Sequence, residues 1–474
     1  MNYNLNQATD DKEQKKSTLA ALKKLIDLIH EEKRTLVLAM FIIFVNAGLS
    51  LLGPYLIGHA IDTYIQSKQY HGLIIFSGIL LGIYATTFVT NYLQIKIMGG
   101  VGQRMLYSLR NAVFNKLQIL PVDFFNQNKA GDLISRINND TDKLNQFFSQ
   151  SLMNFIGSIF TMVGAGIFLL SINFELGLAA LAPAFVIWVF TKAISPWVKS
   201  KNAANLKSTG GLSAEIQESL NNFKVIVAFN RRDYFRKRFD EANQKNYSTA
   251  VSAGLANNIF TPVYGLSANI GQMVVLAFGI YLIMTGQFTI GLLVGFLAYI
   301  NSFYHPLRQL AALWASFQTA MAAWDRISQI LALDTNLQVT PGHCTDNSTS
   351  YLSFRNVSFT YPNGKEVLHH VSFNLERGKT YAFVGPTGGG KTTTASLIAR
   401  LYDATKGLVF LEGKDIRSYE PEERTQKIGF ILQEPFLFTG TVRDNILYGN
   451  SDYRNLTNEE LEKVIHESGL ETLL

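Results

Sequence analysis

TLVLAMFIIFVNAGLSLLGPYLIGHAI, residues 35–61, contains no acidic or basic side chain except His59. Its apolar part is longer than the roughly 20 residues that an α-helix needs to cross the hydrocarbon core of a bilayer. The stretch therefore predicts a first transmembrane span over about 36–58. Apolar segments of similar length predict five more spans, over about 73–95, 152–172, 176–194, 258–284 and 288–307.

The composition agrees with a membrane protein. The chain of 474 residues is 47% hydrophobic and 16% charged, below the roughly 25% of charged residues in soluble domains. A buried helix bundle in a soluble protein would have to hide six uncharged runs from water, so we expect membrane lipid around these helices. The net charge of +6 is spread over loops and interleaved with acids, which predicts no nucleic-acid partner.

The distribution of Lys and Arg predicts the orientation. These residues crowd the long segments 98–150 and 195–256, whereas the opposite connections hold only Lys68. By the positive-inside rule, the long loops and both termini face the cytoplasm of a multi-pass protein in the plasma membrane. Residues 1–34 form a polar cytoplasmic tail, and residues 35–332 form the transmembrane domain. Leu212, Ile216 and Leu220 recur at helical spacing, so we expect the spans to continue as helices beyond the bilayer.

A change of composition near residue 333 marks a second domain. Residues 333–350 are a polar linker that contains the single cysteine, Cys344, which cannot form an intramolecular disulfide. Short alternating runs such as YLSFRNVSFTYP, residues 351–362, are typical of strands. We therefore expect a soluble α/β domain over residues 351–474.

The segment TYAFVGPTGGGKTTTASLIARLY, residues 380–402, carries the clearest chemical signal. A short apolar strand is expected at its start and an apolar-periodic helix at its end, which is the context that the phosphate-binding pattern GxxxxGK[ST] requires. Glycines let backbone N–H groups surround phosphates, the lysine adds positive charge, and the threonine hydroxyl binds Mg²⁺. The predicted binding residues are Gly385, Pro386, Thr387, Gly388, Gly389, Gly390, Lys391, Thr392 and Thr393, with Thr392 also a metal ligand.

Six spans with two long loops, followed by a P-loop domain, resemble the ATP-binding cassette (ABC) half-exporters, the group that contains multidrug and lipid exporters. LPVDFFNQNKAGDLISRINNDTDKL at 120–144, TIGLLVGFLAYINSFYHPLRQLA at 289–311 and VSFTYP at 357–362 also match that family. The resemblance implies ATP and Mg²⁺ as cofactors. It also implies a second half-transporter as partner, either identical or different, and an amphipathic small molecule or lipid as the exported substrate.

The resemblance also assigns roles to residues outside the phosphate loop. It implies that Tyr361 stacks on adenine and that Gln433 is the Q-loop glutamine, which reaches Mg²⁺ and the attacking water. It implies coupling helices near 123–129 and 218–224 that dock on nucleotide domains. No acid, Lys or Arg lies in the cores of the spans, so a pocket for a charged substrate or a proton relay is not expected. The same absence weakens the alternative of a secondary transporter.

The sequence departs from the family pattern after Gln433. The family continues to an LSGGQ signature, a Walker B strand and a switch histidine, and none of these motifs is present before Leu474. We therefore expect an incomplete P-loop domain in which Thr380–Gly385 lacks its neighbouring strand, and no catalytic residue is assigned. A truncated or frameshifted fragment that inserts in the membrane without ATP hydrolysis is the alternative hypothesis, and whether the chain is an enzyme stays open.

Overall fold

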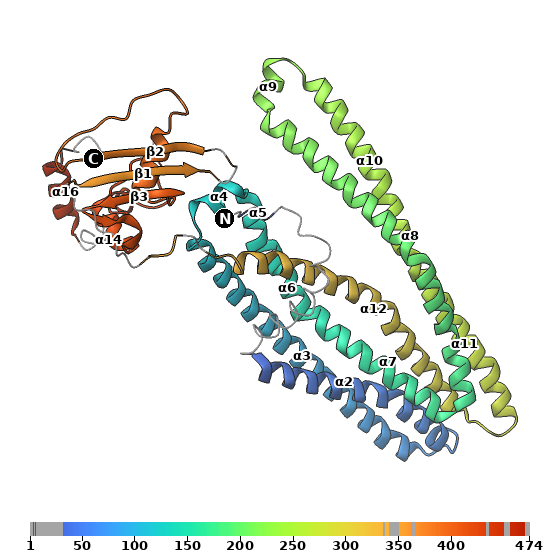
Figure 1. Cartoon of the computed structure of the whole chain (residues 1–474). Helices are drawn as coiled ribbons and strands as arrows, with labels where there is room; N and C mark the ends of the chain where they lie inside the picture. The colour runs from blue at the N-terminus through green and yellow to red at the C-terminus, as the bar shows by residue number, and fades with distance from the viewer. Residues whose placement is uncertain are drawn as a thin grey trace. The chain divides into compact units, whose positions relative to one another are not determined.

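The computed structural model describes residues 3, 5, 32–334, 337–340, 350–361, 364, 366–432, 436–449 and 456–469. Cys344 and Gln433 lie outside this part of the chain. The chain divides into two compact units (Figure 1). One unit is helical and comprises Asp11–Asn111 and Arg136–Ile327. The other contains the sheet and comprises Met1–Asp10, Ala112–Ser135 and Ser328–Leu474.

The described residues include six helical stretches that are long and apolar enough to cross a membrane, which confirms the predicted fold class. Most extend well past their apolar parts. The helix over 174–221 does so although Pro196 lies inside it. The first five stretches are α2 (Lys33–Ala60) with η2 (Ile61–Ile65); α3 (Tyr70–Gln118); α5 (Ala130–Ser135), η3 (Arg136–Asp140), α6 (Thr141–Gln146), η4 (Phe147–Ser151) and α7 (Leu152–Ile172); α8 (Phe174–Asn221); and α10 (Arg232–Asn258) with α11 (Phe260–Met284). The sixth is α12 (Ile290–Leu331).

Helices α8 and α10 run side by side as a long hairpin, with the short helix α9 (Phe223–Ala228) at its tip (Figure 1). Asn173 starts α8 by accepting a hydrogen bond on its side chain from the backbone N–H of Leu176, at 2.9 Å. Such a cap satisfies one of the four N–H groups that a helix start leaves without a partner. The segment near 218–224, where the resemblance implied a coupling helix, covers the end of α8 and the start of α9.

Polar anchors fix α12 against the other helices of its unit. The Tyr304 hydroxyl donates to the carbonyl oxygen of Ala180 in α8, at 2.8 Å. The carboxylate of Asp62 accepts from the backbone N–H of Gly291 at 2.8 Å and from the Thr289 hydroxyl at 2.5 Å. The contact with Gly291 satisfies one of the backbone N–H groups that the start of α12 leaves without a partner inside the helix.

The second unit contains a four-stranded antiparallel sheet with the order β2-β1-β3-β4. Phe354 at its centre is fully buried and pairs with Phe373 on one side and Val409 on the other. Helix α13 (Lys391–Ile398) covers this core with Leu397, which is 1% exposed. The strands are β1 (Leu352–Thr360), β2 (Glu366–Leu375), β3 (Lys406–Leu411) and β4 (Lys414–Asp415), and the remaining helices are α4 (Val122–Gln127), η5 (Ile416–Ser418), α14 (Pro421–Lys427), α15 (Val442–Ile446) and α16 (Asn458–Glu467).

The strand predicted at Thr380–Gly385 is wrong, because the structure has no strand there. Apolar residues form a strand only where a neighbouring strand supplies hydrogen-bond partners, and no described segment pairs with this one. Its side chains stay uncovered, with Val384 90% exposed and Phe383 43% exposed. The phosphate loop therefore follows an irregular segment.

Candidate functional site

The loop before α13 has a backbone that only glycine adopts readily. Its φ angles are +153° at Gly385, +86° at Gly388 and +83° at Gly390. Other residues would be strained at these positive angles. Gly390 is also the N-terminal cap of α13, and a Cβ atom there would lie 2.5 Å from the Leu368 side chain in β2. The predicted glycines therefore shape a tight loop that leads directly into a helix N-terminus.

Lys391 lies across this loop. Its ammonium donates hydrogen bonds to the carbonyl oxygens of Gly385 and Pro386, both at 2.9 Å. The loop from Gly385 to Gly389 is exposed, and so is Thr392 in the first turn of the helix. The Thr392 hydroxyl makes no hydrogen bond to the described residues. A lysine ammonium, a helix N-terminus and an accessible hydroxyl are the groups that phosphate oxygens and a magnesium ion require.

Tyr361 is placed beside the same helix. Its hydroxyl lies 3.1 Å from the Oγ1 atom of Thr393, which is buried. Its ring meets Phe359 edge to face, with centroids 4.8 Å apart, and meets Tyr402 in the same manner at 5.6 Å. The structure thus brings Tyr361 together with the predicted loop, but it turns Thr393 toward the tyrosine and away from the exposed face of the loop.

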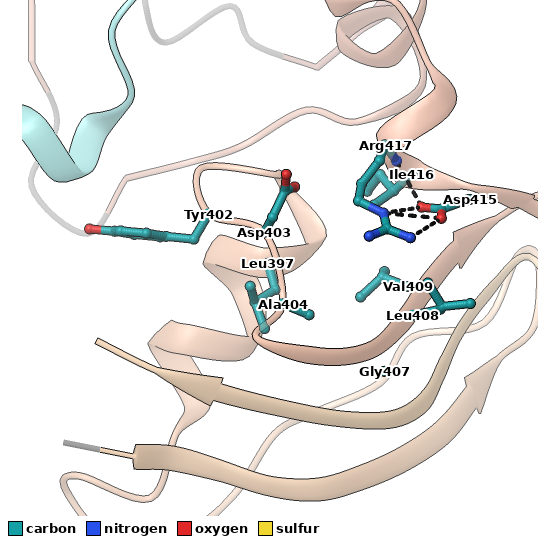
Figure 2. A pocket seen from close by; sticks show the side chains of 10 residues that line it. All are labelled: Leu397, Tyr402, Asp403, Ala404, Gly407, Leu408, Val409, Asp415, Ile416 and Arg417. Carbon is teal, nitrogen blue, oxygen red and sulfur yellow. Dashed lines mark hydrogen bonds and ion pairs between the residues drawn. The ribbon is translucent and has the colours of Figure 1, made fainter. Parts of the chain in front are cut away.

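Tyr402 connects this aromatic cluster to α4, which belongs to the same compact unit. The side-chain amide of Asn126 in α4 donates to the Tyr402 hydroxyl at 2.6 Å. Burial raises the pKa of the Tyr402 hydroxyl, and the hydrogen bond from Asn126 acts against that increase. Figure 2 shows the ring pointing away from Asp415 and Arg417. Sequence reasoning missed Tyr402, because nothing in the local pattern distinguishes it from a packing residue.

Helix α4 is itself anchored by polar contacts. Asp123 is 7% exposed, and its carboxylate accepts from the side-chain amide of Gln127 at 3.0 Å. Burial raises the pKa of the Asp123 carboxyl, and the hydrogen bond from Gln127 partly offsets this effect. Asn128 donates to the carbonyl oxygens of Phe124 and Tyr3, each at 2.8 Å. The segment that the resemblance identified as a coupling helix is thus held firmly at its C-terminal end.

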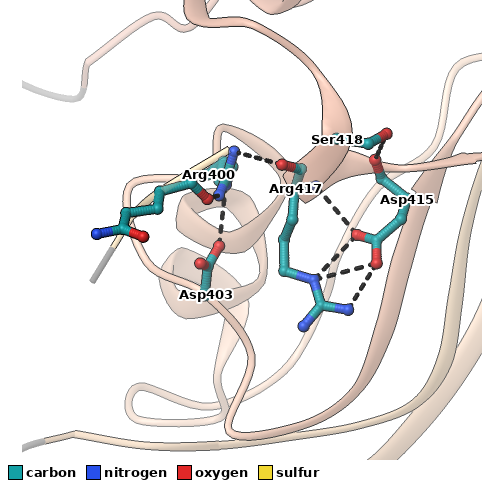
Figure 3. Close-up of polar contacts among 6 residues, drawn as sticks. Arg400, Asp403, Asp415, Arg417 and Ser418 are labelled. Atoms are coloured by element: carbon teal, nitrogen blue, oxygen red, sulfur yellow. Dashed lines mark hydrogen bonds and ion pairs between the residues drawn. The ribbon is translucent and has the colours of Figure 1, made fainter. Parts of the chain in front are cut away.

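Two arginines near α13, Arg400 and Arg417, are paired with groups of the protein (Figure 3). Arg400 is 3% exposed and donates to Asp403, to the Arg417 carbonyl and to the Gln338 carbonyl. The guanidinium of Arg417 pairs with Asp415, with a closest distance of 2.6 Å. The hollow drawn in Figure 2 is about 10 Å³, room for about one water molecule. Arg400 attaches the chain around Gln338 to the domain, and the hollow beside it is too small for a substrate.

The family models match both units of the chain. Residues 36–307 match the model described as ABC transporter transmembrane region, and residues 368–474 match the model described as ABC transporter. A Bacillus subtilis protein, named as an uncharacterized ABC transporter ATP-binding protein, is 29% identical over 98% of this chain and 77% of its own length.

Two further relatives carry more specific names. A Mycobacterium tuberculosis protein, named as a fatty acid ABC transporter ATP-binding/permease protein, is 31% identical over 78% of this chain and 59% of its own length. A second Bacillus subtilis protein, named as a putative multidrug export ATP-binding/permease protein, is 26% identical over 92% of this chain and 76% of its own length.

Proposed function

Because this chain belongs to the ABC transporter family and carries the transmembrane and ATP-binding regions in one polypeptide, we propose that it is a half-transporter that uses ATP to export an amphipathic or hydrophobic compound. Two such chains, identical or different, would form the working transporter in the plasma membrane. Both family regions are matched, so the comparisons do not favour the alternative of an inactive fragment.

The position of Lys391 carries the assignment of the nucleotide site. Its ammonium is held by two backbone carbonyls, which are neutral acceptors, at 2.9 Å each. A phosphate oxygen carries a negative charge, so it attracts the ammonium more strongly than a neutral carbonyl oxygen does. An anionic phosphate therefore competes well for this lysine, while the exposed N–H groups of the loop and the start of α13 receive the remaining oxygens.

When bound with the nucleotide, Mg²⁺ would supply positive charge against the phosphates. Thr392 supports that role, because its hydroxyl is exposed and makes no hydrogen bond to the described residues. Gln433 lies outside the described residues. We assign it as a second metal contact on the family resemblance alone. Tyr361, whose ring plane is nearly perpendicular to those of Phe359 and Tyr402, would stack on the adenine as the family resemblance implies. Thr393 would support that tyrosine through its hydroxyl.

The cargo and the orientation are proposed on separate grounds. The names of the relatives mention fatty acids and multidrug export, and the cores of the spans contain no acid, Lys or Arg. Both observations favour a cargo with a large apolar part. The crowding of Lys and Arg in the long loops supports a cytoplasmic position for these loops, for the nucleotide domain and for both termini.

A binding measurement tests the nucleotide site. We expect Lys391→Ala to weaken binding of a labelled ATP analogue by the purified chain about 10- to 100-fold, since a hydrogen bond to a charged group contributes about 1.5–3 kcal/mol. Lys406→Ala removes an exposed lysine from the start of β3 and serves as the matched control. Equal binding by the Lys391→Ala variant and the control variant would reject the assignment.

A further inference from the structure

A cavity of about 200 Å³ lies between α11 and α12, far in sequence from the nucleotide site. Helix α12 contributes Asn301, Tyr304, His305 and Arg308, whose spacing places them on one helix face. Helix α11 contributes Tyr264 and two small residues. Pockets for whole drug-sized ligands are about 300–1,000 Å³, so this one has room for the polar head of a larger molecule.

The cavity carries a positive charge that has no carboxylate partner among the described residues. From residue 246 to residue 324 the sequence has no Asp or Glu, and Arg308 is its one Lys or Arg. No carboxylate among the described residues pairs with Arg308. Its guanidinium lies 3.2 Å from the Nδ1 atom of His305. Since a guanidinium can only donate, that ring nitrogen would be the acceptor of this contact.

The other polar side chains of the cavity already have partners. Tyr304 donates to the carbonyl oxygen of Ala180. The hydroxyl of Tyr264 lies 3.2 Å from that of Thr191, and Asn301 accepts from Gln272 at 2.9 Å. The walls are therefore fixed by neighbouring helices. Among the residues that line this cavity, Arg308 has several donors without a partner in the described part of the chain, in the planar arrangement that binds a carboxylate or a phosphate with two hydrogen bonds.

The depth of the cavity suits an amphiphile. At 1.5 Å per residue, Arg308 lies about 27 Å along α12 from Ile290, which is close to the hydrocarbon thickness of about 30 Å. A charged head at that level would sit at the membrane boundary while its chain lies along the apolar helices. Arg308 lies one residue beyond the sixth predicted span, 288–307, so it does not contradict the observation that the cores of the spans contain no acid, Lys or Arg.

We infer that this cavity binds the anionic head of a single-chain amphiphile, a carboxylate or a phosphate, with Arg308 as the recognition residue and His305 as the group that positions it. The inference rests on the proposed function, because it specifies the chemical class of the exported compound. Binding requires an anionic head and an apolar chain. The head occupies the cavity, and the chain lies outside it along the apolar helices.

Binding of tritiated palmitate to the purified full chain, in nanodiscs of neutral phosphatidylcholine, tests the inference. We expect Arg308→Gln to weaken binding about 10- to 100-fold and Arg308→Lys to weaken it less, because lysine keeps the charge and loses the planar fork. Arg34→Gln removes another exposed arginine near the end of a span and should have no effect.

Competitors separate the contributions of charge and chain. Lysophosphatidate should displace palmitate from the wild-type protein, whereas hexadecanol, hexadecylamine and inorganic phosphate should not. Unchanged binding by Arg308→Gln would overturn the inference, and so would equal displacement by hexadecanol or by inorganic phosphate. Binding of the labelled ATP analogue is measured in the same samples. If the wild-type chain did not bind the ATP analogue but Arg308→Gln still weakened palmitate binding, the proposed function would be rejected and the amphiphile site would stand.

Discussion

Replacement of Gly390 by alanine should destabilise the nucleotide domain, because two separate costs meet at this position. At φ +83° an alanine is strained by about 1–2 kcal/mol. The new Cβ atom would also lie 2.5 Å from the Leu368 side chain, and such overpacking costs about 1–3 kcal/mol. The total of about 2–5 kcal/mol is a large part of the 5–15 kcal/mol that stabilises a typical domain.

The neighbouring glycines separate the two costs. Gly388 has φ +86°, but a Cβ atom added there would meet nothing within 4 Å, so Gly388→Ala should cost only the backbone strain of about 1–2 kcal/mol. Gly389 has no positive φ, and its Cβ would lie 3.1 Å from the Pro386 carbonyl oxygen in an exposed loop. Gly389→Ala should therefore stay within about 1 kcal/mol of the wild type.

Hydrogen exchange on the full chain measures these effects where they arise. Leu368 pairs with Phe359 in the register of β1 and β2, so the amides around this pair report the free energy of opening of the sheet. Each 1.4 kcal/mol of destabilisation should raise their exchange rate about tenfold. If Gly388→Ala destabilised the sheet as much as Gly390→Ala, the contact with Leu368 would be irrelevant and the reasoning would fail.

Three further predictions concern other parts of the chain. Asn126→Ala should raise the exchange rate of the α4 amides by about 2- to 10-fold, because it removes the hydrogen bond to Tyr402, and the same effect from Tyr402→Phe is required if that bond is responsible. Burial raises the pKa of Asp123, so the folded state holds that proton more tightly. Stability should then fall as pH rises from about 4 through the raised pKa and stay level above it, and Asp123→Asn should remove this slope in urea titrations at several pH values. In a cysteine-free background, a membrane-impermeant thiol reagent should label Gln287→Cys from outside and miss Lys237→Cys, and the reverse pattern would overturn the orientation.

The phosphate loop could be predicted from sequence because its chemistry is local. The glycines, Lys391 and Thr392 are contiguous, and the loop is shaped by their own backbone preferences, so no distant residue was needed to recognise it. The membrane helices could be predicted for a similar reason. A bilayer imposes a minimum length of uncharged sequence and allows few alternatives to a helix, so a stretch such as residues 35–61 is informative without its neighbours.

Contacts between distant segments depended on the tertiary structure. Nothing in the sequence pairs Asn126 with Tyr402, which is 276 positions away, and Arg308 alone is indistinguishable from an ordinary charge at a membrane boundary. The role proposed for Arg308 depends on the cavity that α11 and α12 form beside it. The segment Thr380–Gly385 has a sequence typical of a strand but forms none in this structure, because no described segment pairs with it. Local backbone preference and solvent partitioning are properties of short segments, whereas side-chain partners and strand pairing are decided by which segments the fold brings together.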